Sequence, residues 1–419
     1  MAEHENQQSD SPKFKNQDRV EVTSVSGDLV IEDCRTLNPS EGDTITVSGT
    51  VRIRGDLLIR GSLKAHGLKA RGREIIIEGD LVVENSVIVD KGKLEVHGNL
   101  KATEVSADSA ITVMKDLDCE VAKAGGSLKV VGNTTAQRLS AGGSVKIEGD
   151  AKVNRISSGG SISVGGRIEC DEFSVGGAGK VSHGMIRKVD VGGSFKASGA
   201  VQVEEIDVGG AAKVGPGSNV EQVDVGGSYK AEGDQTFGSI DVGGAVKIDG
   251  NASGRSIDVG GSVSISGDLT LTEDIDVGGK VTVDGNLKVS KKIKVGGTVE
   301  VGGRIDTYRI VVGGRVEAKY IYAEDGFRVG RNSDVRGFVE SKNILIRERA
   351  RVESVYGDDI RIEERARVKS IYGRAIYIER DAVIEGDVLY TESLEGEKGV
   401  TFRSEPRKVD SLPPPDQLN

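Results

Sequence analysis

The sequence predicts an all-β chain: a single long three-sided parallel β-helix (β-solenoid), with about 17 residues in each coil and about 22 coils. Three observations predict this fold class. Glycine pairs return at a nearly constant interval, apolar residues alternate on both sides of each pair, and aromatic residues make up only 4% of the chain, with no Trp. A compact globule of this size normally builds its core around several aromatic anchors. Small, repeated cores fit the composition better.

Gly-Gly pairs mark the repeat and return every 16 to 18 residues through the middle of the chain. The main pairs begin at Gly125, Gly142, Gly159, Gly176, Gly192, Gly209, Gly226, Gly243, Gly260, Gly278, Gly296 and Gly313. Extra pairs at Gly165 and Gly302 fall about a third of a coil further on. Helical solenoid repeats need about 30 residues or more, and propeller blades about 40. The short interval therefore indicates one coil of a three-sided β-helix.

Alternating apolar residues supply the strands. In SIDVGGAVKI (239–248), Ile and Val occupy every second position on both sides of the glycines, as strands with one buried face require. Some coils add a third pair, such as Leu269 and Leu271. We expect each coil to pair in parallel with the next, about 4.8 Å away.

The glycine pairs are expected to form the corners, where glycine permits positive φ without a Cβ clash. The residues assigned to corners are Gly192, Gly193, Gly209, Gly210, Gly226, Gly227, Gly243, Gly244, Gly260 and Gly261. No helix follows the pairs, so they make a poor phosphate cradle. They also do not match the nine-residue calcium repeat.

Charged residues line up beside the corners and form a candidate contact stripe. The acidic residues that precede Val-Gly-Gly are Asp190, Asp207, Asp224, Asp241, Asp258 and Asp276. The basic residues across the corner are Lys180, Lys196, Lys213, Lys230 and Lys247. A solvated ion ladder, in which the lysines offset the repulsion of about 1 kcal/mol per acidic pair, is one interpretation. A cation site and a lateral contact surface are the alternatives.

Composition excludes several function classes. The net charge of −10 argues against a nucleic-acid partner. Cys34, Cys119 and Cys170 are far apart and match no metal spacing, which indicates a reducing compartment. The chain shows no secretory h-region and no apolar run long enough for a transmembrane segment, so we expect a cytoplasmic protein.

The sequence does not favour an enzymatic β-helix. Carbonic anhydrases of this fold need three converging histidines, whereas the four here are scattered: His4, His66, His97 and His183. The acyltransferase hexapeptide fits VGGAAK (208–213) but not VGGSFK (191–196). No nucleophile elbow, P-loop or CxxC is present. We therefore predict no enzyme activity and assign no catalytic, cofactor-binding or metal-binding residue.

The chain is expected to contain five segments. They are a disordered polar tail (1–19), irregular coils (20–120), regular Gly-Gly coils (121–320), a third set of coils (321–403) and a disordered Pro-rich tail (404–419). In the third set, arginines interleave with acidic residues and Tyr356 and Tyr372 mark corners. This pattern indicates an ion-pair network or, alternatively, a partner-binding patch. No amphipathic capping helix is visible for the open strand edges at the two ends, so we expect copies to stack end to end.

The segment RARVESVYGDDIRIEERARVKSIYGRAIYIERDAVIEGDVLYTESLEGEKGVTF (349–402) resembles bactofilins, the polymer-forming cytoskeletal proteins. The residues that match the closing pattern of that family are Ala382, Val383, Gly386, Asp387, Val388 and Phe402. The resemblance is strongest over the last 100 residues or so. Bactofilin cores are commonly much shorter, and the repeated Asp-Val-Gly-Gly block is not typical of them.

The resemblance implies nucleotide-independent filaments of this chain itself that scaffold membrane- or envelope-associated proteins, in the cytoplasm and peripherally at the inner membrane face. Pro12–Lys15 (PKFK) is the candidate for membrane targeting. Two alternatives remain: a β-helical module for dimerisation or partner binding, and a hexapeptide-type β-helix enzyme.

Overall fold

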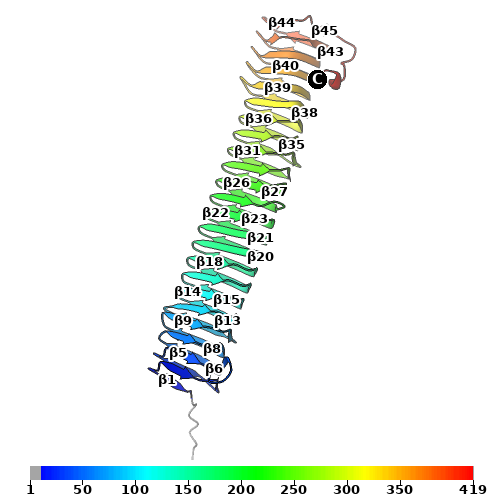
Figure 1. The fold of residues 1–419 in the computed structure, drawn as a ribbon. Coiled ribbons are helices and arrows are strands. Elements are labelled where there is room, and N and C mark those ends of the chain that lie inside the picture. Colours follow the sequence, from blue (N-terminus) through cyan, green and yellow to red (C-terminus); the bar gives the residue numbers. More distant parts are fainter. Residues whose placement is uncertain (1–10, 419) are drawn as a thin grey trace, which may run out of the picture. The chain divides into compact units, whose positions relative to one another are not determined.

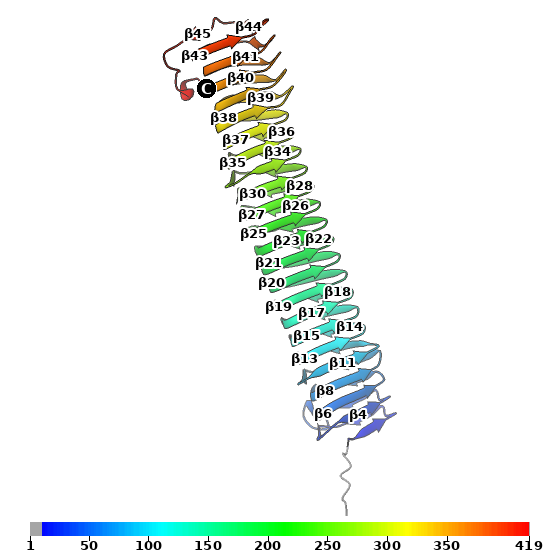
Figure 2. The same ribbon diagram turned by 180° about the vertical axis from the view of Figure 1, so that it is seen from behind.

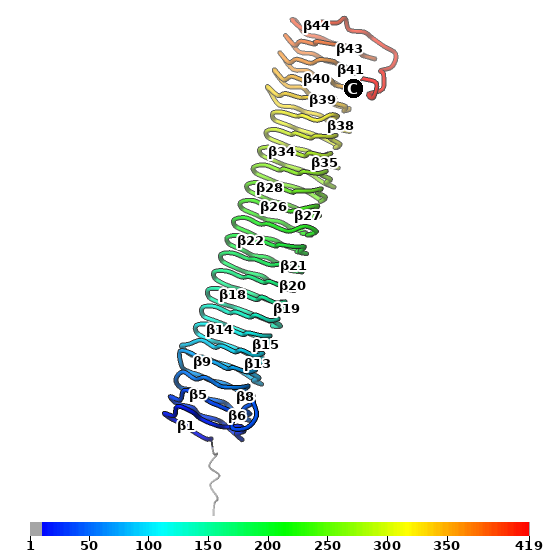
Figure 3. Tube along the Cα trace, viewed as in Figure 1, coloured from blue at the N-terminus to red at the C-terminus, as the bar shows by residue number. Residues whose placement is uncertain are grey.

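The computed structural model describes residues 11–418. It is all-β and forms a parallel β-solenoid of about 23 turns with about 17 residues per turn, which confirms the predicted fold class. The chain divides into two compact units, residues 1–209 and residues 210–419. Within each unit the strands stack as successive rungs, as the ribbon shows from two sides (Figures 1 and 2) and the Cα tube shows coil by coil (Figure 3).

The first unit contains the strands up to β23. They are β1 (Lys13–Lys15), β2 (Arg19–Glu21), β3 (Ser24–Val25), β4 (Leu29–Glu32), β5 (Thr36–Asn38), β6 (Thr44–Arg54), β7 (Leu57–Ile59), β8 (Ser62–Arg71), β9 (Glu74–Ile77), β10 (Leu81–Val83), β11 (Ser86–Asp90), β12 (Lys93–Val96), β13 (Leu100–Ala107), β14 (Ala110–Val113), β15 (Leu117–Ala124), β16 (Ser127–Val130), β17 (Thr134–Ala141), β18 (Ser144–Ile147), β19 (Ala151–Ser158), β20 (Ser161–Val175), β21 (Ala178–Val191), β22 (Ser194–Ala197) and β23 (Val201–Val208).

The second unit contains the remaining strands and one short 3₁₀ helix. They are β24 (Ala211–Val214), β25 (Asn219–Val225), β26 (Ser228–Glu232), β27 (Gln235–Val242), β28 (Ala245–Asp249), β29 (Ala252–Gly254), β30 (Ser256–Val259), β31 (Ser262–Ile265), β32 (Leu269–Leu271), β33 (Ile275–Val277), β34 (Lys280–Val283), β35 (Leu287–Val295), β36 (Thr298–Val301), β37 (Arg304–Val312), β38 (Arg315–Val329), β39 (Asp334–Ile346), β40 (Arg351–Ile362), β41 (Arg367–Ile378), β42 (Val383–Ile384), β43 (Val388–Gly396), β44 (Thr401–Phe402), β45 (Arg407–Lys408) and η1 (Pro415–Gln417).

Each coil has three faces, which we name from one coil of the second unit. Face A is the strand before the Gly-Gly corner (β30), face B the strand after it (β31), and face C the strand after the next corner (β32). Strands of one face pair in parallel with those one coil away, for example β30 with β33 and β31 with β34. In many coils faces C and A form one continuous strand, as in β15 and β35.

The core of each unit is a thin column of aliphatic side chains. The strand register places aliphatic residues of successive coils next to one another. Leu128 lies between Ile111 and Val145 in the first unit, and Val263 lies next to Val281 in the second. All five are at most 1% exposed. Burial of one such side chain stabilises by about 1.5–3 kcal/mol, so the column holds the coils together through many equal increments.

The corner glycines are required for a reason that differs from our expectation. Gly243 and Gly260 do not have positive φ. Instead, successive corners stack so closely that a Cβ on Gly243 would lie 2.6 Å from the carbonyl oxygen of Gly226, and a Cβ on Gly260 would lie 2.6 Å from that of Gly243. In the first unit, a Cβ on Gly192 would lie 2.5 Å from the oxygen of Gly176. Close backbone approach, and not a left-handed conformation, selects glycine here.

The corner between faces B and C carries a ladder of Asp and Asn side chains. Each side-chain oxygen accepts a hydrogen bond from the backbone N–H of the corresponding residue one coil on: 2.8 Å from Asn251 N to Asp234 Oδ1, and 2.9 Å from Asp268 N to Asn251 Oδ1. The ladder members are Asp80, Asn99, Asp116, Asn133 and Asp150 in the first unit, and Asp234, Asn251, Asp268 and Asn286 in the second. Asp and Asn alternate strictly, so no two carboxylates are direct neighbours. The extra glycine pairs at Gly165 and Gly302 lie at this second corner.

The face A to face B corner changes its construction near the end of the second unit. Arg349, Arg365 and Asp381 adopt φ of 57°, 57° and 59°. Each is followed by an alanine (350, 366 or 382) that is 0% exposed. A residue in the left-handed region closes this tighter turn, and alanine is small enough to fill the space beneath it.

The two ends of the chain differ from the tails that we expected. β1 pairs with β4, so described residues before position 20 already belong to the first coil. Residues 404–418, expected as a disordered tail, contain β45 and η1, and the chain turns back after β45 to end beside β39 and β40 (Figures 1 and 2). Residues 1–10, the remainder of the expected N-terminal tail, lie outside the described residues. The expected boundaries at 120/121 and 320/321 stay predictions.

Candidate interaction surfaces

The acidic stripe is present on face A. In the second unit, the strand register places Asp224, Asp241, Asp258 and Asp276 side by side, and in the first it pairs Asp190 with Asp207. Burial, followed by the charges of its two neighbours, raises the pKa of Asp241. Within residues 11–418, only Asp276 of the second-unit members has an ion pair, with Lys294.

The lysine column is also aligned, but it does not neutralise the acidic stripe. Lys213, Lys230 and Lys247 are in register on face B. Their ammonium groups instead pair with acidic residues at the end of the same face: Lys230 Nζ lies 3.0 Å from Asp249 Oδ2, and Lys213 Nζ lies 2.5 Å from Glu232 Oε1. The expected compensation across the corner is therefore replaced by compensation within face B.

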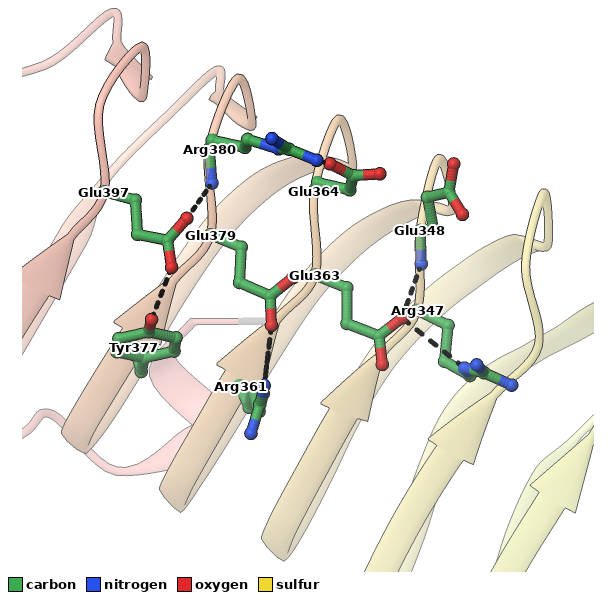
Figure 4. Close-up of polar contacts among 9 residues, drawn as sticks. All are labelled: Arg347, Glu348, Arg361, Glu363, Glu364, Tyr377, Glu379, Arg380 and Glu397. Carbon is green, nitrogen blue, oxygen red and sulfur yellow. Dashed lines mark hydrogen bonds and ion pairs between the residues drawn. The ribbon is translucent and has the colours of Figure 1, made fainter.

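The arginine-rich coils of the second unit form a ladder of ion pairs along one corner (Figure 4). Glu363 Oε2 accepts a hydrogen bond of 3.1 Å from the Glu348 backbone and lies 3.4 Å from Arg347 Nε. One coil further on, Arg361 Nη2 donates to Glu379 Oε1 at 2.7 Å. These hydrogen bonds and ion pairs link consecutive coils at the corners that lack Gly-Gly.

The same ladder extends toward the end of the unit (Figure 4). Glu397 accepts hydrogen bonds from the Tyr377 hydroxyl at 2.6 Å and from the Arg380 backbone at 3.1 Å. Arg380 Nε lies 2.5 Å from Glu364 Oε2, and this hydrogen bond lowers the pKa of Glu364. Because these charges are satisfied by one another, the ladder is suited to holding coils in register.

A groove of about 690 Å³ runs beside this ladder, on the outer surface where faces C and A meet. Its lining carries both signs of charge, including Arg309, Asp325 and Arg361, together with apolar residues such as Ile344. Arg309 and Asp325 form an ion pair with each other. The groove thus combines charged and apolar side chains, and the partner-binding patch left open by the sequence stays a prediction.

Within residues 11–418, the cysteines and histidines do not form a site. Cys119 and Cys170 are buried, and burial raises the pKa of each thiol to about 12. The histidines contact only local partners: His66 lies 3.1 Å from Glu84, His97 2.9 Å from Glu95, and His183 3.1 Å from Ser182. His4 lies outside the described residues. Among those residues, no cluster of three or more His, Cys, Asp or Glu could hold a metal ion.

The first and last coils each place an aromatic side chain on the interior column. In the first unit, Phe14 of β1 is in register with Ile31, which is 1% exposed. In the second unit, Phe402 of β44 is in register with Ile384, which is 0% exposed. Phe14 and Phe402 are only half-buried because each is the last rung of its column. Sequence reasoning noted Phe402 through the family resemblance and did not identify Phe14.

The repeated coils, strand edges and ion ladders define a protein of the parallel β-solenoid class. Residues 257–356 match the model of the bactofilin family, described as polymer-forming cytoskeletal. The match confirms the resemblance drawn from the sequence. It covers β30 to the middle of β40, and so begins upstream of the segment that suggested it. No curated protein and no solved structure matches the chain.

The matched family is structural and not enzymatic, and the solenoid fold together with this match supports a polymer-forming cytoskeletal protein. Among residues 11–418, no helix is long and apolar enough to span a membrane.

Proposed function

We propose that this chain is a non-enzymatic scaffold that assembles by joining terminal coils of successive copies, without nucleotide. The observation that carries the proposal is the pair of half-buried aromatic rungs, Phe14 and Phe402, at the open ends of the aliphatic columns. Each continues a column of fully buried side chains, so a further coil supplied by another copy would complete its burial.

The backbone at these ends supports the same arrangement. Among the described residues, β1, β2 and β3 pair only with β4, β5 and β6, which leaves one edge of each first-coil strand unpaired. At the other end, β44 pairs only with β42. Open strand edges template pairing with another chain. Pairing of backbone edges and burial of apolar rungs use no nucleotide.

The matched family is polymer-forming, which implies that this chain binds other copies of itself. We extend the proposal to a cytoplasmic scaffold at the inner membrane face that holds envelope-associated proteins, on the basis of the resemblance. The expected membrane-targeting stretch does not support direct attachment: Lys13 and Lys15 belong to β1, and both form ion pairs with Glu32, at 2.9 and 3.7 Å. Attachment would therefore require another surface.

Sedimentation of the full chain, free of nucleotide, tests the assembly mode. We expect large polymers for the unmodified chain and loss of polymers for Phe14→Asp and for Phe402→Asp, because each buries a carboxylate at a coil-to-coil contact. Tyr308→Asp is the matched control, since Tyr308 is 46% exposed on a strand far from either end of the fold in sequence. Circular dichroism would verify that each variant keeps its β structure.

Two outcomes would count against the proposal. If the unmodified chain stays monomeric at micromolar concentration, the polymer-forming function is wrong for this chain. If Tyr308→Asp dissolves the polymer while both end variants polymerise, the chain assembles through its sides and the terminal-coil contact is wrong.

A further inference from the structure

The end of the chain covers an apolar strip on the outside of face C in the second unit. We define the C-terminal strap as residues 409–418, and the face C strip as Tyr320, Phe338, Tyr356, Tyr372 and Leu389. Val409, Leu412 and Leu418 of the strap pack against the strip. Figures 1 and 2 both show the strap descending beside the strands that carry the strip.

The strip residues point outward, away from the core. In face C the inward positions are held by Val339, Ile371 and Val388, which are at most 1% exposed, and the strip residues alternate with them. Phe338 and Tyr372 are nevertheless only 2% and 6% exposed. Side chains on an outer face become this inaccessible only when something lies over them, and here that is the strap.

The outward-facing column of residues on face C changes from polar to mostly aromatic at the coils where the strap ends. One strand register relates Thr270, Lys288, Asp306 and Tyr322, and the first three are polar. Continuing along the coils, the column passes through Glu340 and then reaches Tyr356, Tyr372 and Leu389. Apart from Glu340, whose carboxylate accepts a hydrogen bond from the Tyr320 hydroxyl, this column is therefore apolar beside the strap and polar before it. This match between chemistry and coverage indicates a surface adapted to an occupant.

The strap is held by apolar contacts. Val409 N–H donates to Tyr390 O at 2.9 Å, but beyond that residue no hydrogen bond or ion pair joins the strap to the solenoid within the described part of the chain. Pro413, Pro414 and Pro415 cannot donate, and Pro414 has φ −63° and ψ 147°, in the polyproline II region. Tyr320 stacks on Phe338 with ring centroids 5.5 Å apart. Aromatic surfaces of this kind receive proline-rich segments because such segments lose little entropy on docking.

We propose that the face C strip is a binding surface for proline-rich segments flanked by leucines, and that the C-terminal strap is its resident, exchangeable ligand. The occupant is a segment with the chemistry of LPPPDQL (412–418). Aliphatic side chains on either side of the prolines contact the strip, and the prolines span between them. The strap occupies in cis a surface that can take the same type of segment in trans.

A binding experiment with the full chain tests this proposal. The double substitution Leu412→Asp and Leu418→Asp releases the strap, because it places two carboxylates against aromatic rings. The probe is a fluorescent synthetic peptide, VDSLPPPDQLN, measured by anisotropy. We expect the released variant to bind the peptide at least about tenfold more tightly than the unmodified chain, in which the tethered strap competes at high effective concentration.

Matched controls separate the strip from general charge effects. Ser411 is exposed, so Ser411→Asp adds a carboxylate to the strap without removing a contact and should bind the peptide as weakly as the unmodified chain. Adding Tyr356→Asp to the released variant should abolish binding, and a peptide with both leucines changed to Asp should not bind.

The proposal is overturned if the folded, released variant binds the peptide no better than the unmodified chain, or if Tyr356→Asp leaves binding intact. Amide hydrogen exchange on the unmodified chain gives a test that needs no substitution. The amide of Val409, which donates a hydrogen bond to Tyr390 O, should exchange far faster than the hydrogen-bonded amides of β40, because the strap detaches while the solenoid stays folded. Equal protection would show that the strap is a fixed part of the fold.

Discussion

Replacing Gly243 with alanine tests why glycine occupies the Gly-Gly corners. The added Cβ would lie 2.6 Å from Gly226 O and 3.5 Å from Gly226 C. Cβ atoms do not approach a backbone oxygen within about 3 Å, so the corner must move by several tenths of an ångström. That movement strains two backbone hydrogen bonds, from Gly243 N to Val225 O (3.0 Å) and from Gly260 N to Val242 O (3.1 Å). Overpacking of this kind costs about 1–3 kcal/mol.

Amide hydrogen exchange is the appropriate assay, because long repeat arrays open locally and need not unfold in one step. A loss of about 2 kcal/mol predicts about 30-fold faster exchange at the amides of Gly243 and Gly260. Gly326→Ala is the matched control in the same unit: its φ is not positive, and its Cβ would lie 3.5 Å from Arg309 Nε, an ordinary contact. We expect it to change exchange little.

Two results would refute this reasoning. If Gly243→Ala and Gly326→Ala behave alike, stacking distance does not select glycine at the corner. If Gly243→Asn is better tolerated than Gly243→Ala, a left-handed conformation would be the requirement after all, because Asn tolerates positive φ better than Ala does.

Three further predictions follow from the ladders and the buried thiols. Asn251→Asp keeps the acceptor for Asp268 N–H but sets three carboxylates in a row, so it should destabilise by about 1 kcal/mol per new neighbour in urea denaturation at low ionic strength, and less at high; a salt-independent loss would contradict the charge explanation. Asp241→Asn should stabilise at neutral pH by about 1 kcal/mol or less. Because the pKa of Asp241 is raised in the folded protein, its protonated form favours folding below the ordinary Asp pKa, and this contribution is lost as pH rises through the raised value. The stability gained by Asp241→Asn should therefore vanish in acid, and a gain that persists in acid would contradict this explanation. Cys119 and Cys170, with pKa raised to about 12, should resist iodoacetamide at pH 8 until the protein unfolds, and rapid labelling of the folded chain would show that the thiols are accessible.

The repeat interval and the alternation of Val and Ile were sufficient to predict the solenoid and its coil length. They succeed because each coil must return to the same place, so one spacing and one alternation recur throughout the chain. Alignment of Asp224 with Asp241 and of Lys213 with Lys230 followed from the same spacing. Which charges compensate one another did not follow, because that depends on where side chains lie across the corner.

Other features of the fold and of the candidate surfaces could be identified only from the structure. The φ of a glycine cannot be read from its position at a corner, and the stacking distance between corners becomes visible only in the structure. The Asp and Asn ladder did leave a signal, since a glycine precedes Asn99, Asn133 and Asn251 at the same point of each coil. The strap was missed because its polar and proline-rich composition is typical of disorder. The outward aromatic residues Tyr356 and Tyr372 were the signal that something covers face C.

The central claim is that copies assemble through their terminal coils without nucleotide. Electron microscopy of the purified full chain in nucleotide-free buffer, combined with diffraction from aligned material, tests it most directly. We predict filaments with a reflection at about 4.8 Å along the filament axis, because coils of successive copies continue the same stack. Dispersed monomers, or filaments whose 4.8 Å repeat lies across the axis, would contradict the claim.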